Sequence, residues 1–209
     1  MDNLKKCYEQ LVENPYEIFM IRSDGQIAEK EQLLNMANED LGEKFPSQEL
    51  HIFPGSFNPL HFGHRIIFNQ IFSFKKVFEI SLSRIGKPNL SLEELKQRLD
   101  QFTWYAPVVV TDAPRFIEKC SVFLNSGIKN FTFHIGVDTI QRMRDDYGEV
   151  GIRGLPARFS VYDRDMGNGI LKYPTSEFRH KISNVSRNPS QPPDEFLGYS
   201  STKIRNSKK

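Results

Sequence analysis

The feature that most constrains the fold of this chain is a regular alternation of short apolar runs and amphipathic segments that begins at Leu50. Apolar runs of about four to eight residues predict buried strands, and apolar residues spaced three and four apart predict helices. The predicted strands are residues 50–53, 77–82, 107–111, 131–135 and 159–162. The predicted helices are residues 62–73, 91–102, 114–125 and 138–146. This alternation predicts right-handed βαβ units, and therefore an α/β fold with a doubly wound, parallel, five-stranded sheet.

The first 48 residues follow a different pattern. A polar helix is predicted from Asp2 to Glu13, a short strand over 17–21, a turn at "SDGQ", and a second helix over about 29–41. We therefore divide the chain into an N-terminal α/β appendage, residues 1–48, and a main domain, residues 49–209.

Two local signals mark boundaries inside the main domain. Ser91 and Glu94 have the spacing of a capping box, which starts a helix. Residues 183–198 are rich in Pro, Ser and Asn, which predicts a long loop.

Composition excludes several classes of function. The formal net charge is only +2, which argues against nucleic-acid binding. Cys7 and Cys120 are far apart and not in a metal-binding spacing, so we expect free thiols in a reducing compartment. No run approaches the roughly 18 apolar residues of a membrane span, and no basic-then-apolar leader opens the chain. These observations predict a cytoplasmic protein that binds neither membrane nor nucleic acid.

The segment "HIFPGSFNPLHFGHRIIFNQIF", residues 51–72, joins the first strand of the main domain to its first helix. Gly55 permits close approach of a phosphate to the backbone, and a helix that begins near His61 offers N–H groups and a positive dipole end. His61 and His64 are three residues apart, so both rings can lie on one helix face, with Gly63 leaving room between them. The segment therefore predicts an anion site, although two such histidines can also serve as capping or surface residues.

The ordered residues of this segment carry a specific resemblance. The string Gly55-Ser56-Phe57-Asn58-Pro59-x-His61-x-Gly63-His64 resembles the signature of the nucleotidylyltransferase superfamily, whose domain is Rossmann-like. The resemblance implies that His61 and His64 contact the phosphates of a nucleoside triphosphate and stabilise charge while the α-phosphate is attacked. Gly55, Ser56, Phe57, Asn58 and Gly63 would then belong to the nucleotide-binding loop.

A second motif lies near the end of the chain. "YSSTKIRN", residues 199–206, is similar to the I-S-S-T-x-I-R segment of the same superfamily, with Tyr199 in place of Ile. The resemblance implies that Ser201 and Thr202 cap a helix that holds the β- and γ-phosphates, and that Arg205 pairs with them. The chain ends soon after Arg205, so the helix expected after this motif would be very short.

Weaker signals lie between the two motifs. Lys87 follows the second strand, as a lysine does in pantetheine-phosphate and pyridine-nucleotide adenylyltransferases, where it bridges nucleophile and α-phosphate; the alternative is a solvated lysine. "GVDT" resembles a segment of the pyridine-nucleotide branch, which implies that Gly136 and Asp138 lie near the nucleoside or the acceptor. Asp138 is also expected as a helix N-cap. Arg164 follows the fifth strand.

The activity implied by the resemblance is transfer of a nucleotidyl group, with adenylyl from ATP as the first choice. The expected acceptor is a small phosphomonoester, nicotinamide or nicotinate mononucleotide, and pyrophosphate leaves with Mg²⁺ held mainly by the nucleotide. The tryptophan expected to stack on a pyridine ring is absent, and Tyr147 is the nearest aromatic. Alternatives are a pantetheine-phosphate adenylyltransferase, a cytidylyltransferase, a non-catalytic nucleotide sensor of the same fold, and an α/β interaction module. The oligomeric state is left open.

Overall fold

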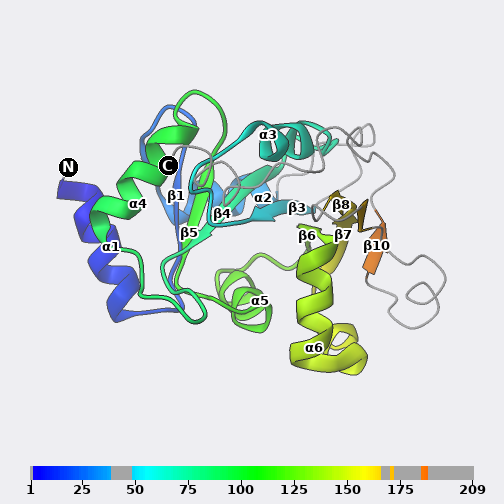
Figure 1. Ribbon diagram of the computed structural model, residues 1–209. Helices are drawn as coiled ribbons and strands as arrows, with labels where there is room; N and C mark the ends of the chain where they lie inside the picture. Colours follow the sequence, from blue (N-terminus) through cyan, green and yellow to red (C-terminus); the bar gives the residue numbers. More distant parts are fainter. Residues whose placement is uncertain (1, 39–48, 166–169, 172–184, 188–209) are drawn as a thin grey trace. The chain divides into compact units, whose positions relative to one another are not determined.

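The computed structural model describes residues 2–38, 49–165, 170–171 and 185–187 (Figure 1). The chain forms two compact units, and each is treated separately. Unit 1 comprises Met1–Ser56 and Phe74–Phe131, and unit 2 comprises Phe57–Ser73 and Thr132–Lys209. Among the described helices, none combines the length and the apolar content that a membrane span needs.

Unit 1 holds a mostly parallel sheet in the order β3-β4-β5-β1-β2. The strands β3 (Leu50–Pro54), β4 (Lys76–Ser81) and β5 (Val108–Thr111) pair in parallel. Every residue of β5 is buried, as in a strand covered on both faces. The three strands match three of the predicted ones within a residue at each end, since apolar runs this continuous are typical of buried parallel strands.

The first residues of the chain extend this sheet. β1 (Phe19–Ile21) pairs antiparallel with β5 and with β2 (Ile27–Ala28). The predicted appendage therefore supplies edge strands that are hydrogen-bonded to the main sheet. The helices α1 (Asp2–Glu13) and α2 (Lys30–Asn38) confirm the two predicted helices of this region as far as the described residues extend.

The remaining helices of unit 1 follow β4 and β5. α4 (Leu92–Leu99) and the 3₁₀ turn Asp100–Phe102 cover the predicted helix 91–102, and α5 (Phe116–Asn125) covers 114–125. The capping box that starts α4 is confirmed: Glu94 N–H donates to Ser91 Oγ at 3.2 Å, and Ser91 N–H donates to Glu94 Oε2 at 2.9 Å. Tyr8 Oη donates to the Leu90 carbonyl at 2.8 Å, which holds α1 beside the start of α4 (Figure 1).

Unit 2 contains a parallel set of strands in the order β10-β7-β6, formed by β6 (Phe131–Gly136), β7 (Arg158–Tyr162) and β10 (Val185–Arg187). A short antiparallel pair, β8 (Arg164–Asp165) with β9 (Ile170–Leu171), follows β7. The helices are α3 (Phe62–Asn69) and α6 (Val137–Arg153). β10 lies inside the segment 183–198 that we predicted as loop, so that prediction is wrong at these three residues.

Three predictions about the fold need correction. All five predicted strands form, but a count of five omits β1, β2 and β10, which sequence patterning alone does not assign to the sheet. α3 ends at Asn69 instead of residue 73, because the chain turns with Ile71 N–H donating to the Phe68 carbonyl at 3.2 Å. α6 runs on to Arg153 across a kink at Gly148, whose φ of 65° is outside the helical region.

Candidate functional site

The candidate site of unit 2 is centred on the N-terminus of α3. His61 is the N-cap residue, with an extended backbone at φ −127° and ψ 171°. Its ring does not cap the helix. The capping interaction runs the other way, because the His61 N–H donates to Nδ1 of His64 at 3.3 Å. In a neutral His64 this acceptor role places the ring proton on Nε2.

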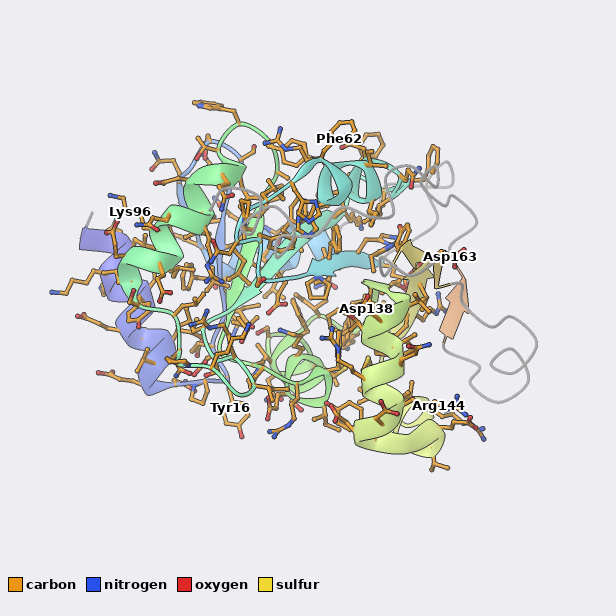
Figure 2. All side chains as sticks on the ribbon, in the orientation of Figure 1. Tyr16, Phe62, Lys96, Asp138, Arg144 and Asp163 are labelled. Carbon is orange, nitrogen blue, oxygen red and sulfur yellow. The ribbon has the colours of Figure 1, made fainter. Side chains whose placement is uncertain are left out.

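The two imidazoles lie face to face. Their ring centroids are 3.5 Å apart with an interplanar angle of 24°, and both therefore lie on one side of the first helical turn. His61 is buried at 8% exposure and His64 is half-buried, so His64 is the more accessible of the two rings. Phe62, between His61 and the buried Gly63, points outward and is 53% exposed (Figure 2). The prediction that His61 and His64 share a face is confirmed.

Phe57 completes this cluster. Its ring meets His64 edge-on, with centroids 4.9 Å apart and an interplanar angle of 81°. Phe57 is 1% exposed and has a φ of 42°, in the left-handed region that side chains rarely adopt. Backbone strain of this kind costs about 1–3 kcal/mol and persists only where the surroundings impose it. Asn58, the next residue, is exposed, and its peptide bond to Pro59 is cis.

The other predicted site residues of unit 2 lie at the start of α6. Gly136 is the N-cap, so the prediction that Asp138 is the N-cap is wrong; Asp138 lies in the first turn. A carboxylate is favourable there because it faces the positive end of the helix dipole. Asp138 Oδ2 also pairs with Arg142 Nη2 at 3.5 Å. Tyr147 is half-buried and directly precedes the kink at Gly148.

Unit 1 carries the remaining described candidates. The Gly55 N–H donates to the Glu79 carbonyl at 3.0 Å, which prolongs the ladder between β3 and β4. Ser56 is exposed, and its carbonyl accepts a hydrogen bond from Arg98 Nη1 at 3.0 Å. Lys87 is exposed on a turn after β4, where its N–H donates to the Arg84 carbonyl at 3.2 Å. Ser201, Thr202 and Arg205 lie outside the described residues, as does the side chain of Arg164.

Sequence reasoning missed Arg98, which is 3% exposed and holds the Ser56 carbonyl from α4. A signal was present, since Arg98 lies beside Leu95 and Leu99 on the buried face of an amphipathic helix. A charged residue at such a position needs a partner.

It also missed a buried polar pair in unit 2, in which His134 Nδ1 lies 3.0 Å from Tyr162 Oη. Burial raises the pKa of Tyr162 far above its usual value, so the phenol keeps its proton, and the tautomer of His134 decides which of the two groups donates. Asp163, which follows β7, is 5% exposed. Tyr162 and Asp163, two polar residues at the end of the predicted strand 159–162, were the available signal.

The described residues do not include a preformed metal centre, because in these ranges no three His, Cys, Asp or Glu side chains gather as a metal-binding group.

Comparisons of the chain with protein-family models, with curated proteins and with solved structures gave no match. The geometry of the described residues and the sequence motifs therefore carry the functional argument.

Proposed function

We propose that this protein is a nucleotidylyltransferase that moves an adenylyl group from ATP to a small phosphomonoester and releases pyrophosphate. The observation that carries the proposal is the stacked His61–His64 pair at the N-terminus of α3, inside a motif that resembles the superfamily signature. In this proposal the α/β elements form a Rossmann-like, doubly wound domain that acts in the cytoplasm. Cys7 and Cys120, both free thiols, are compatible with that compartment.

His64 is the principal phosphate ligand in this proposal. Its Nδ1 accepts the His61 N–H, and its ring is held between His61 and Phe57, so the Nε2–H direction is fixed before substrate arrives. A fixed donor aimed at developing charge needs no reorganisation during the reaction, which is the basis of electrostatic catalysis. The helix dipole of α3 adds to the same field.

The reaction is a direct displacement. An oxygen of the acceptor phosphate attacks the α-phosphorus of ATP, the bond from that phosphorus to the α,β-bridging oxygen breaks, and Mg²⁺-bound pyrophosphate leaves with the electron pair. A phosphate dianion is a nucleophile near neutral pH, so no general base is needed. Lys87, Ser201, Thr202, Arg205, Gly136 and Asp138 enter the proposal through the sequence resemblance.

A pyrophosphate-release assay tests the proposal. ATP and CTP are each combined with nicotinamide mononucleotide, nicotinate mononucleotide and phosphopantetheine in the presence of Mg²⁺. We expect acceptor-dependent release with ATP and a pyridine mononucleotide. Pyrophosphate release only with CTP would show that the donor is CTP instead of ATP. Release only with phosphopantetheine would show that the acceptor is not a pyridine mononucleotide. In both cases the assignment of nucleotidyl transfer would be kept. If no pair releases pyrophosphate but ATP raises the melting temperature, the protein is a nucleotide sensor.

A further inference from the structure

Unit 1 contains a hollow that shares no lining residue with the proposed nucleotide site. Its volume is about 300 Å³, at the lower end of the range for small-molecule sites. Residues from three segments line it: the turn after α1, the chain just after β5, and the part of α5 from Ile117 to Val122. Figure 2 labels Tyr16 on the first of these segments.

The backbone of unit 1 creates this hollow. β1 runs antiparallel to β5 with Phe19 opposite Val110, so the residues that precede β1 run alongside those that follow β5. The turn is fixed by Asn14, whose Oδ1 accepts the Tyr16 N–H at 3.3 Å and whose carbonyl accepts the Glu17 N–H at 3.0 Å. The position of Tyr16 over the start of α5 is therefore set by strand register and by this turn.

The walls are largely apolar and are accessible to solvent. Tyr16 is 61% exposed and Ile117 is 50% exposed, while Pro114 and the buried Val122 also line the hollow. Apolar side chains that converge on a hollow favour a ligand with an apolar body, and the face of the tyrosine ring attracts a cation.

The charges that line the hollow are negative. Asp112 Oδ1 accepts hydrogen bonds from the Ser83 N–H, at 2.9 Å, and from the Ser83 hydroxyl. These neutral donors orient the Asp112 carboxylate and leave its charge in place. Glu118 is the second carboxylate; Arg115 pairs with it at 3.3 Å, but both side chains are more than a third exposed, so the pairing is weak. The Arg115 N–H also donates to Glu118 Oε2 at 2.8 Å, so the Glu118 carboxylate already interacts with the positive N-terminal end of α5.

We propose that this hollow binds a small organic cation, a primary amine that carries a short aromatic or aliphatic body. The ammonium group is held by Asp112 and by the ring face of Tyr16, and the body lies against Ile117 and Pro114. This proposal is independent of the nucleotidyl transfer proposed above, because none of these residues belongs to that reaction.

Three probes of similar size separate charge from shape: benzylamine, benzyl alcohol and benzoate. Each is titrated into the full-length protein at low salt, and backbone amide shifts of Ser121 and Val122 report occupancy of the hollow. We expect benzylamine to bind at least about tenfold more tightly than benzyl alcohol, as hydrogen bonds to charged groups warrant, with benzoate weakest. Equal binding of benzylamine and benzyl alcohol, or tighter binding of benzoate, would overturn the proposal.

Variants locate the cation. Asp112→Asn keeps an oxygen for Ser83 and should reduce benzylamine binding to the level of benzyl alcohol. Asp100→Asn removes an exposed carboxylate elsewhere in unit 1 and should change nothing. Tyr16→Ala should weaken benzylamine about two- to fivefold, the value of an exposed cation–π contact. A benzylamine preference that survives in a folded Asp112→Asn protein contradicts the assignment. Should that variant not fold, Ile117→Lys, at an exposed position, must abolish benzylamine binding by placing a cation in the hollow.

Discussion

Two clusters of ionisable side chains, one in each unit, are built in opposite ways. In unit 1, Lys119 Nζ lies 2.6 Å from Glu79 Oε1, which also accepts the Thr111 hydroxyl at 2.5 Å. The Lys119 side chain is 7% exposed and the Glu79 side chain is 1% exposed, so the two charges pair inside the protein, although Glu79 Oε2 has no hydrogen-bond partner among the described residues. In unit 2, the stacked imidazoles of His61 and His64 lie at a helix N-terminus, with His64 half-buried.

The difference shows that the burial of a polar cluster indicates its role: a fully buried cluster stabilises the fold, and a partly exposed cluster can contact a substrate. The Glu79–Lys119 pair joins β4 to α5 and is shielded from any ligand in solution. The His61–His64 pair is positioned by its own helix and by Phe57, and the half-buried His64 is accessible to solvent. We therefore expect changes in the first cluster to alter stability, and changes in the second to alter chemistry.

The largest expected effect follows from breaking the buried ion pair. Lys119→Met leaves an uncompensated carboxylate in the interior, which should cost about 3–5 kcal/mol of unfolding free energy in urea denaturation. The double variant Glu79→Gln, Lys119→Met removes both charges and should recover most of this loss. If the single variant loses less than about 1 kcal/mol, the pair does not carry the structural role assigned to it.

The second prediction concerns the other cluster. His64→Ala removes the oriented donor and should lower adenylyl transfer by roughly 10²–10³-fold, the usual effect of deleting one preorganised donor to a transition-state charge. The expected change in unfolding free energy is much smaller, because His64 is only half-buried. His51→Gln serves as the matched control, since it removes a histidine from β3 of unit 1 and should leave turnover unchanged. Turnover of the His64→Ala protein within about twofold of the parent would contradict the role of His64.

Much of the fold follows from local sequence signals. The strands β3 to β7 are short, mainly apolar runs, and the Ser91–Glu94 spacing marks the start of α4 because a capping box needs only neighbouring residues. The pairing of β1 with the edge of β5 involves residues about 90 positions apart, and a three-residue strand carries no signal for its partner.

The candidate site was also predictable only in part, because local spacing can be seen in the sequence and tertiary contacts cannot. His61 and His64 share a helix face by spacing alone, whereas the left-handed backbone of Phe57 is imposed by its surroundings. Glu79 and Lys119 each interrupt an apolar pattern, and this shows that a partner is needed without showing which one. The contact of Arg98 with Ser56 depends on tertiary packing in the same way.

The third prediction sharpens the comparison with a purely local change in unit 1. Ser91→Ala removes the cap of α4 and should cost about 1 kcal/mol of unfolding free energy. Ser91→Asp keeps an acceptor for the Glu94 N–H and should retain most of the stability. Neither variant should alter the Michaelis constants of ATP or acceptor. Loss of turnover beyond the change in folded fraction would show that α4 acts on the chemistry, and the separation of roles between the two clusters would fail.

The smallest expected effect concerns His51 and the loss of folding stability at low pH, which we expect to be separate from the pH dependence of turnover. Burial lowers the pKa of His51 below its ordinary value, with the nearby Lys76 acting in the same direction and Glu49 opposing it. As pH falls below about 6.5, the unfolded chain therefore binds a proton at His51 more readily than the folded protein, and stability decreases. His51→Gln removes this titratable group, and with it the difference of bound protons that His51 makes between the unfolded and folded states. Urea denaturation at pH 7.5 and 5.5 should show a smaller acid loss of stability in the variant than in the parent. Turnover should keep the pH dependence of the parent, because His51 takes no part in the proposed reaction. An identical acid loss in both proteins would show that His51 titrates alike in the folded and unfolded states.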